Sequence, residues 1–281
     1  MRKKVVHLIL VMLGLSILSL VALRLWDERA DRIEWARLAA SQPTSPAVYD
    51  PVMVADLPEP AQRFFNYTIR PGSALLTVAE IDMAGEFSLG TRDNPDYQPM
   101  NARQILAAPT GFVWKVRMPT VVAVSGSDTG SWTRFRILGV IPVARMGGDA
   151  DHARAAYGRY VAEALFWTPA ALLPGPGVVW EALNPDTARV TVTHNGLSQA
   201  VDIKMDAEGR PEEVHFMRWS DANPERRYRL QPFGGYLSDF REVQGFRVPF
   251  NVEAGNMFGT DEYFPFFKAK VTAVRFPLPG S

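Results

Sequence analysis

The chain has 281 residues, of which 47% are hydrophobic and 21% charged, so it has enough apolar side chains for a packed core and too many for a disordered chain. Its 30 basic and 30 acidic residues give a formal net charge of zero, which provides no general attraction to nucleic acid. The sequence contains no cysteine, which excludes disulfides, thiolate catalysis, cysteine-ligated zinc and iron–sulfur clusters.

An apolar run from Val5 to Leu23 predicts a membrane anchor near the N-terminus. As a helix it spans roughly 28 Å, about the hydrocarbon thickness of a bilayer. Basic residues occupy positions 2–4, and such a cluster stays on the cytoplasmic side. We therefore expect a single-pass protein of the cell (inner) membrane, with a cytoplasmic N-terminus and a periplasmic or extracellular main domain. The alternative is a cleaved signal peptide, but Leu20 lies where a cleavage site needs a small residue.

Three segments are expected along the chain. Residues 1–40 should form the transmembrane anchor and a juxtamembrane continuation of the same helix. Residues 41–55 contain three prolines and are expected to form a linker. Residues 56–281 should form one β-rich extracytoplasmic domain, which opens with a short helix. Asp56 and Glu59 have the spacing of a capping box at the start of that helix.

Apolar and polar residues alternate from about Leu75 onward, which is typical of antiparallel strands with one buried face. The alternation is clearest in residues 81–89, 112–118, 190–193, 201–205 and 246–254. Turn sequences such as Asn195-Gly196 and Gln244-Gly245 separate neighbouring runs. Short turns between strands indicate a meander, whose sheet is either open and curved or closed into a barrel.

One long helix is expected to interrupt the strands over residues 151–166. Its apolar and small residues recur with helical periodicity, so the face that they form should pack on the sheet. Asp149 and Asp151 at its start suit the N-cap and the helix dipole. Pro169 and Pro174 follow its end, where they prevent the helix from continuing.

The sequence around this helix resembles a family of uncharacterised bacterial membrane-anchored proteins, catalogued as a domain of unknown function. The segments that carry the resemblance are 159–163, 166–174, 109–114, 138–144 and 240–249. The resemblance brings no established activity or catalytic residue. It implies a fold similar to the periplasmic lipoprotein carriers (LolA/LolB-like), in which a curved antiparallel sheet wraps a helix and leaves an apolar cavity for acyl chains. The fold class expected is mainly β (α+β), with a half-barrel around one main helix.

Large side chains that should point inward form the candidate ligand-binding cavity. They are Trp114, Tyr160, Glu163, Trp167, Trp180, Phe216, Phe240 and Phe250. Burial of an acyl chain against such a wall stabilises binding by about 25 cal/mol per Å². The alternative is a fully packed aromatic core. A carboxylate at the cavity edge suits acid–base chemistry, but Glu163 follows Arg159 by four residues, and we favour an ion pair between them.

Two polar patches have both a functional and a structural interpretation. Asp149, Asp151 and His152 are possible metal ligands, although helix capping already explains the aspartates. Arg134 and Arg136 share one face of a strand and have the chemistry to bind a phosphate or carboxylate. We favour capping for the first patch and a solvated strand face for the second, and we expect neither a metal ion nor a cofactor.

The sequence contains no zinc-protease motif, phosphate-binding glycine loop, dinucleotide fingerprint or nucleophile elbow, so we do not expect an enzyme. The favoured function is binding of a hydrophobic ligand, a membrane lipid or an acyl chain, beside the membrane. A module that binds another envelope protein is the first alternative. An enzyme of unrecognised type is the second.

Overall fold

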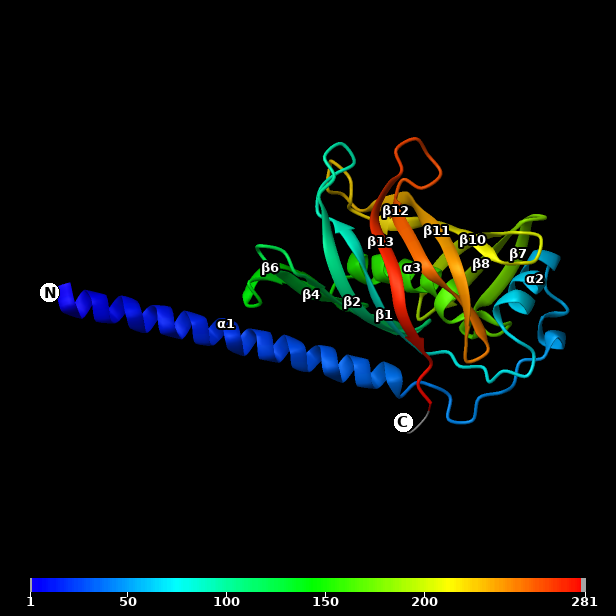
Figure 1. Ribbon diagram of the computed structural model, residues 1–281, viewed down its shortest axis with the longest axis horizontal. Helices are drawn as coiled ribbons and strands as arrows, with labels where there is room; N and C mark the ends of the chain where they lie inside the picture. The colour runs from blue at the N-terminus through cyan, green and yellow to red at the C-terminus, as the bar shows by residue number, and fades with distance from the viewer. Residues whose placement is uncertain (1, 279–281) are drawn as a thin grey trace.

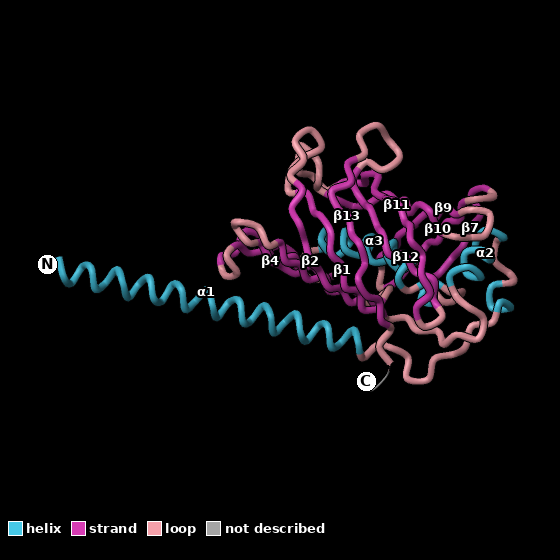
Figure 2. The backbone as a smooth tube through the Cα atoms, viewed as in Figure 1, coloured by secondary structure: helices cyan, strands magenta, loops and turns pink. Residues whose placement is uncertain are grey.

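The computed structural model describes residues 2–278, and within them the chain forms one curved antiparallel sheet of 13 strands with three α-helices (Figures 1 and 2). The helices are α1 Arg2–Ala39, α2 Glu59–Thr68 and α3 Ala150–Trp167, with short 3₁₀ helices η1 Pro51–Val54 and η2 Pro169–Leu172. The first six strands are β1 Ala79–Ser88, β2 Tyr97–Ala107, β3 Gly111–Met118, β4 Val124–Thr129, β5 Trp132–Ile137 and β6 Ile141–Gly147. The other seven are β7 Val178–Asn184, β8 Thr187–His194, β9 Leu197–Met205, β10 Pro211–Ser220, β11 Arg229–Val243, β12 Phe246–Asn256 and β13 Phe264–Arg275.

The sheet is built from two meanders that meet in its middle. Strands β1 to β6 run outward in order to one edge, and β7 to β13 return from the other edge until β13 pairs with β1. Strands β6 and β7 are the two ends of this order, so the sheet is open and the expected half-barrel is confirmed, whereas a closed barrel is not formed. All strand pairs are antiparallel, as the short turns predicted.

Helix α3 connects the two edges and lies against the concave face of the sheet, behind the strands in Figure 1. It contacts strands of both meanders, including β3 on one side and β10 on the other. Val161, Ala164 and Leu165 have no exposed surface, which confirms that this face packs on the sheet. The side chain of Asp149 accepts a hydrogen bond from the His152 backbone N–H at 2.8 Å, so Asp149 is the N-cap.

The start of the domain differs from the expected capping box. The N-cap of α2 is Pro58, which makes no side-chain cap hydrogen bond, so the prediction that Asp56 caps this helix is wrong. Gln62 orders the preceding turn instead, since its amide donates to the backbone oxygens of Ala55 and Leu57. These bonds satisfy two carbonyls of the turn, but they do not replace a cap, which would accept from the free N–H groups of the first helical turn.

Residues 41–55, expected to form a linker, pack against the domain. The side-chain oxygen of Gln42 accepts from the backbone N–H groups of Thr77 and Val78, and its amide donates to the oxygens of Val78 and Pro277. Tyr49 is buried as well, and its hydroxyl donates to Asn66 at 2.8 Å. This segment therefore fixes the position of the chain that leads out of α1.

The second half of α1 packs along the convex face of the sheet (Figure 1). The side of the helix that faces the sheet carries acidic residues. Asp27 contacts guanidinium groups of β5 and β6: it lies 3.1 Å from Arg134 and 2.6 Å from Arg145, and it also accepts from Arg136. About one turn further along the helix, Asp31 lies 3.2 Å from Lys115 of β3. The same side then becomes apolar, since Leu38 is buried against Val78, Ile105 and Val113.

These contacts correct one interpretation of the sequence. Arg134 and Arg136 were expected to form a solvated strand face, but they lie under α1 and neutralise the buried carboxylate of Asp27. Burial opposes ionisation of Asp27, yet the hydrogen bond from Arg145 and the three positive charges hold its pKa below the usual value of 3.8. The partner of these arginines is separated from them by more than a hundred residues, so the pattern of β5 alone does not show it.

Candidate ligand-binding pocket

A pocket of about 300 Å³ lies between α3 and the concave face of the sheet. We call it the apolar pocket. Its wall is mostly hydrophobic and includes Met83, Phe87, Trp114, Phe135, Phe166, Trp167, Val214, Phe216, Phe233, Leu237, Val252, Phe266 and Phe267. Its volume lies at the lower end of the range of about 300 to 1,000 Å³ that is usual for ligand pockets.

The sequence produces this space in two ways. Side chains two residues apart in a strand share a face, so Val214 and Phe216 of β10 both line the pocket, as do Thr133 and Phe135 of β5. On the opposite wall α3 presents Ala162, whose methyl group fills little volume. Helix α3 also contributes Phe166 and Trp167 to the wall, and the small side chain of Ala162 beside them leaves the interior unfilled at this position.

Four of the eight candidate cavity residues line the apolar pocket, namely Trp114, Glu163, Trp167 and Phe216. The other four lie elsewhere in the core or at its rim. Tyr160 packs on Phe112 with a ring-centroid distance of 5.9 Å. Trp180 packs between the two phenylalanines of α2, and its indole N–H donates to the Leu172 oxygen at 2.9 Å. Phe240 contacts Tyr67 at a ring distance of 5.8 Å, and Phe250 lies under the guanidinium of Arg241 at 4.3 Å.

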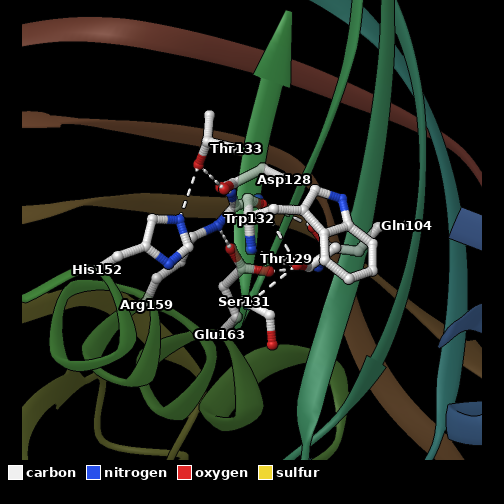
Figure 3. Close-up of polar contacts among 9 residues, drawn as sticks. All are labelled: Gln104, Asp128, Thr129, Ser131, Trp132, Thr133, His152, Arg159 and Glu163. Carbon is white, nitrogen blue, oxygen red and sulfur yellow. Dashed lines mark hydrogen bonds and ion pairs between the residues drawn. The ribbon is translucent and has the colours of Figure 1, made fainter. Parts of the chain in front are cut away.

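A polar network closes one side of the pocket (Figure 3). Arg159 of α3 donates to Glu163 at 2.7 Å, to Asp128 of β4 at 2.6 Å and to Gln104 of β2 at 3.1 Å. The Gln104 amide in turn donates to the second oxygen of Glu163. Burial opposes the charge of Arg159, but its two carboxylate partners outweigh that effect and raise its pKa above the usual value.

This network contains the ion pair between Arg159 and Glu163 that the helical spacing indicated. Both oxygens of Glu163 accept hydrogen bonds, which leaves this carboxylate committed to structure and poorly placed to exchange protons with a ligand. Asp128 and Gln104 were not foreseen as site residues. The polar sequence of β4 lacks the alternation that marks the other strands, and that is why Asp128 was missed.

The aspartate and histidine patch at the start of α3 is part of the same region. Asp149 caps the helix, and His152 Nε2 lies 3.0 Å from the Thr133 hydroxyl (Figure 3). Among residues 2–278, no group of three or more histidine, aspartate or glutamate side chains is arranged to hold a metal ion. His152 thus connects α3 to β5, and Asp151 connects it to β10 by accepting a hydrogen bond from the Trp219 indole N–H at 2.8 Å.

Arg218 of β10 is a second arginine in the pocket wall, and it was not among the predicted site residues. Its guanidinium lies 4.7 Å from the centre of the Phe233 ring. Its Nε is buried and has no hydrogen-bond partner within the described part of the chain. The alternation of the strand could have identified it, because Arg218 follows Val214 and Phe216 at every second position, on the inner face of β10.

The fold and the pocket define a protein with an apolar N-terminal helix and a curved open sheet that holds a hydrophobic pocket against one helix. Residues 47–269 match the family of unknown function DUF6544, and the chain belongs to this family. This match confirms the resemblance seen in the sequence. Among curated proteins, none matches the chain.

Two solved structures are similar at low sequence identity. The LolA superfamily protein NE2245 from Nitrosomonas europaea is 9% identical, with a TM-score of 0.42, and the alignment covers 78% of this chain and 92% of that one. A putative outer membrane lipoprotein-sorting protein domain from Vibrio parahaemolyticus is 10% identical, with a TM-score of 0.34 and a coverage of 78% and 89%. Neither likeness says what this chain binds.

Proposed function

We propose that this protein binds a lipid or an acyl chain in the apolar pocket while α1 holds it at a membrane. The observation that carries the proposal is the pocket of about 300 Å³ with its aromatic and aliphatic walls. Protein interiors are normally packed as densely as organic crystals, and an empty apolar space of this size is unfavourable. An acyl chain would fill the space and bury its own apolar surface at the same time.

The membrane part of the proposal rests on α1. This helix is long and apolar enough to cross a bilayer by length and composition, and the side chains of residues 5–23 are mostly exposed to solvent in the structure. A stripe of exposed leucine, isoleucine and valine of this length is unfavourable in water and favourable in lipid. The basic residues at positions 2–4 favour a cytoplasmic N-terminus and a domain on the outer side.

The turns next to α1 fit a position close to the bilayer. Arg24 follows the apolar run, and its guanidinium lies over Gly139 in the β5–β6 turn. Exposed apolar side chains lie on the β3–β4 turn, the β5–β6 turn and strand β6, namely Val121, Val122, Leu138, Ile141 and Val143. The two turns are joined by a hydrogen bond from the Leu138 N–H to the Ala123 oxygen at 2.9 Å. A membrane surface at the end of the apolar run would cover these side chains.

Topology is tested with a reporter that is active only outside the cytoplasm, fused to the C-terminus. We expect an active fusion and an intact N-terminus in the mature protein. An inactive fusion would contradict the orientation. A mature N-terminus near Ala22 would show that α1 is cleaved as a signal sequence.

Ligand binding is tested with the full chain in lipid nanodiscs and a fluorescent fatty acid, with empty nanodiscs as the background. Substitution Ala162→Leu places a larger side chain in the pocket, and we expect it to lower the affinity at least tenfold. Because the new side chain enters empty space, the melting temperature should stay the same or rise. The matched control is Ala155→Leu on the same helix, which does not line the pocket and should leave the affinity unchanged.

Two results would overturn the proposal. If Ala162→Leu destabilises the protein by about 1–3 kcal/mol, the space is already packed and the substitution strains it. If the parent protein binds no fatty acid and native mass spectrometry finds no lipid with it, the pocket is not a ligand site. The exposed apolar turns would then favour a module that binds an envelope protein. We propose binding rather than catalysis because two carboxylates of the pocket, Asp128 and Glu163, are committed to Arg159, and the third, Glu253, accepts a hydrogen bond from the Tyr263 hydroxyl at 3.2 Å.

A further inference from the structure

The apolar pocket contains a positive charge that the protein does not neutralise. Arg159 has two carboxylate partners, Asp128 and Glu163, at 2.6 and 2.7 Å. Arg218 has none: no carboxylate among residues 2–278 lies within ion-pair distance of its guanidinium. Three carboxylates, Asp128, Glu163 and Asp221, act on Arg218 electrostatically without pairing with it. The first two are held by Arg159, and Asp221 is exposed directly after the end of β10.

The surroundings of Arg218 are also energetically unfavourable for an unpaired guanidinium group. Burial lowers its pKa, and the positive charge of Arg159 lowers it further. A buried donor without an acceptor costs free energy, more so when it is charged. The indole Nε1 of Trp114, another residue of the pocket wall, is likewise buried without a partner within the described residues. Both unsatisfied groups are donors, and the carboxylates of Asp128 and Glu163 in the same wall already accept from Arg159.

We propose that Arg218 binds the anionic head group of the ligand, and that this head group is the carboxylate of a free fatty acid. The inference rests on the proposed function, since it names the class of acyl ligand that the apolar pocket takes. A carboxylate oxygen accepts from a guanidinium in a charge-assisted hydrogen bond, which satisfies Arg218 and offsets the cost of its burial. Phe233 beneath the guanidinium holds it in place for this contact.

The position of Arg218 also gives the direction of the acyl chain. Arg218, Phe216 and Val214 lie on one face of β10, and all three line the pocket. A carboxylate at Arg218 therefore leaves the hydrocarbon chain to extend along Phe216 and Val214, between β10 and α3. The head is at the end of β10 that leads to the β10–β11 turn, and the tail lies over the apolar wall.

A single negative charge fits this site better than a double one. One carboxylate neutralises Arg218 and leaves the two ion pairs of Arg159 intact. A phosphate monoester carries up to two charges at neutral pH, and its second charge would be close to the carboxylates of Asp128 and Glu163, which repel it. The charges in the wall thus favour a carboxylate over a phosphate.

The test compares three ligands that share one chain length: oleate, oleyl alcohol and oleoyl lysophosphatidate. Each is measured against the full-length protein in nanodiscs, with empty nanodiscs as the background. We expect the parent protein to bind oleate about 10 to 100 times more tightly than the alcohol, the range of one hydrogen bond to a charged group. Oleate should also bind more tightly than lysophosphatidate.

The variant that isolates the head-group contact is Arg218→Met, which keeps the length of the side chain and removes its charge. We expect it to lose the preference for oleate and to keep the affinity for oleyl alcohol. Its melting temperature should not fall, because an unpaired buried charge is removed. The control is Arg154→Met, since Arg154 lies over Trp219 at 4.0 Å and outside the pocket wall, and both affinities should be unchanged.

Three results would overturn the inference. The parent protein binds oleate and the alcohol equally, Arg218→Met weakens both ligands to the same extent, or lysophosphatidate binds more tightly than oleate. In each of these cases the pocket still takes an acyl chain and the proposed function stands. If none of the three ligands binds, the proposed function itself fails.

Discussion

Substitution Asp27→Asn should release the second half of α1 from the convex face of the sheet. The carboxylate of Asp27 is almost completely buried, with 1% of the residue exposed, and it receives hydrogen bonds from Arg136 and Arg145 and the charge of Arg134. Asparagine has the same shape but no charge. The substitution therefore keeps the packing of the helix and removes the counter-charge of three arginines.

The size of the effect follows from the burial of the partners. Removing one member of a buried ion pair costs about 3–5 kcal/mol, because the remaining charge stays buried without compensation. Arg145 is partly hydrated, with 37% of its side chain exposed, so we expect the lower end of that range. A loss of about 3 kcal/mol corresponds to a roughly 100-fold larger population of the undocked helix.

Limited proteolysis measures this population. Trypsin can cut the docked half of α1 after Arg29, Arg32 and Arg37, and cleavage of a transiently open segment follows its equilibrium population. We expect Asp27→Asn to be cut roughly 100 times faster than the parent. The control is Glu28→Gln, because Glu28 forms a surface pair with Arg24 that is worth a few tenths of a kcal/mol. A cleavage rate for Asp27→Asn that stays within a few-fold of the control would refute the reasoning.

The same contact should respond to acid. Because the pKa of Asp27 is lower in the docked state than its usual value of 3.8, the carboxylate contributes its full stabilisation above pH 3.8. This contribution is lost as the pH falls from 3.8 through the lowered pKa. Tryptic cleavage is not practical in acid, so pepsin replaces trypsin there, and in Asp27→Asn this part of the pH dependence should be absent.

Three further predictions concern the stability of the domain. Ala164→Asp should unfold it, since Ala164 has no exposed surface and a buried unpaired carboxylate costs several kcal/mol. The control Ala155→Asp, at a partly exposed site of the same helix, should have a melting temperature close to that of the parent. Gly245→Ala should lower the free energy of unfolding by about 1–3 kcal/mol in chemical denaturation, because Gly245 has a φ of +89° and an added Cβ would lie 2.0 Å from the Ser73 hydroxyl. Burial raises the pKa of Tyr157 to about 12, so the neutral hydroxyl contributes its full stabilisation below the usual pKa of 10.0, and this contribution is lost as the pH rises toward 12. In alkaline unfolding, Tyr157→Phe should reduce the dependence of the free energy of unfolding on pH.

The strands that could be predicted from sequence are those with one apolar and one polar face. Residues 112–118 and the hairpin around Asn195-Gly196 show this alternation, and they form β3 and the turn between β8 and β9. Strand β4 has no such pattern, because its side chains make polar contacts instead of alternating between the core and the solvent. Asp128 pairs with Arg159 on the inside, and the Ser127 hydroxyl accepts a hydrogen bond from the Trp132 indole N–H at 3.2 Å.

The candidate site was predicted in part for a related reason. Alternation shows which face a side chain occupies, but it does not show how far along the strand a helix lies. Trp180 was correctly expected to point inward, yet α2 fills the space beside it with Phe64 and Phe65, so no room for a ligand remains there. The charged residue Arg218 was passed over because an arginine within a strand is more often a solvated residue than part of a pocket wall.

Strand β5 connects α1 to the apolar pocket, since its alternate side chains lie on the two faces of the sheet. Arg134 and Arg136 contact Asp27 of α1, whereas Thr133 and Phe135 line the apolar pocket. Strands β5 and β6 form one edge of the described sheet. Because Asp27 pairs with arginines of both strands, α1 covers this edge from outside. A chain shortened to begin at residue 24 keeps that cover, while one that begins after residue 40 exposes the arginines together with Ile105 and Val113. Helix α1 therefore packs on the outer face of a strand whose inner face lines the apolar pocket.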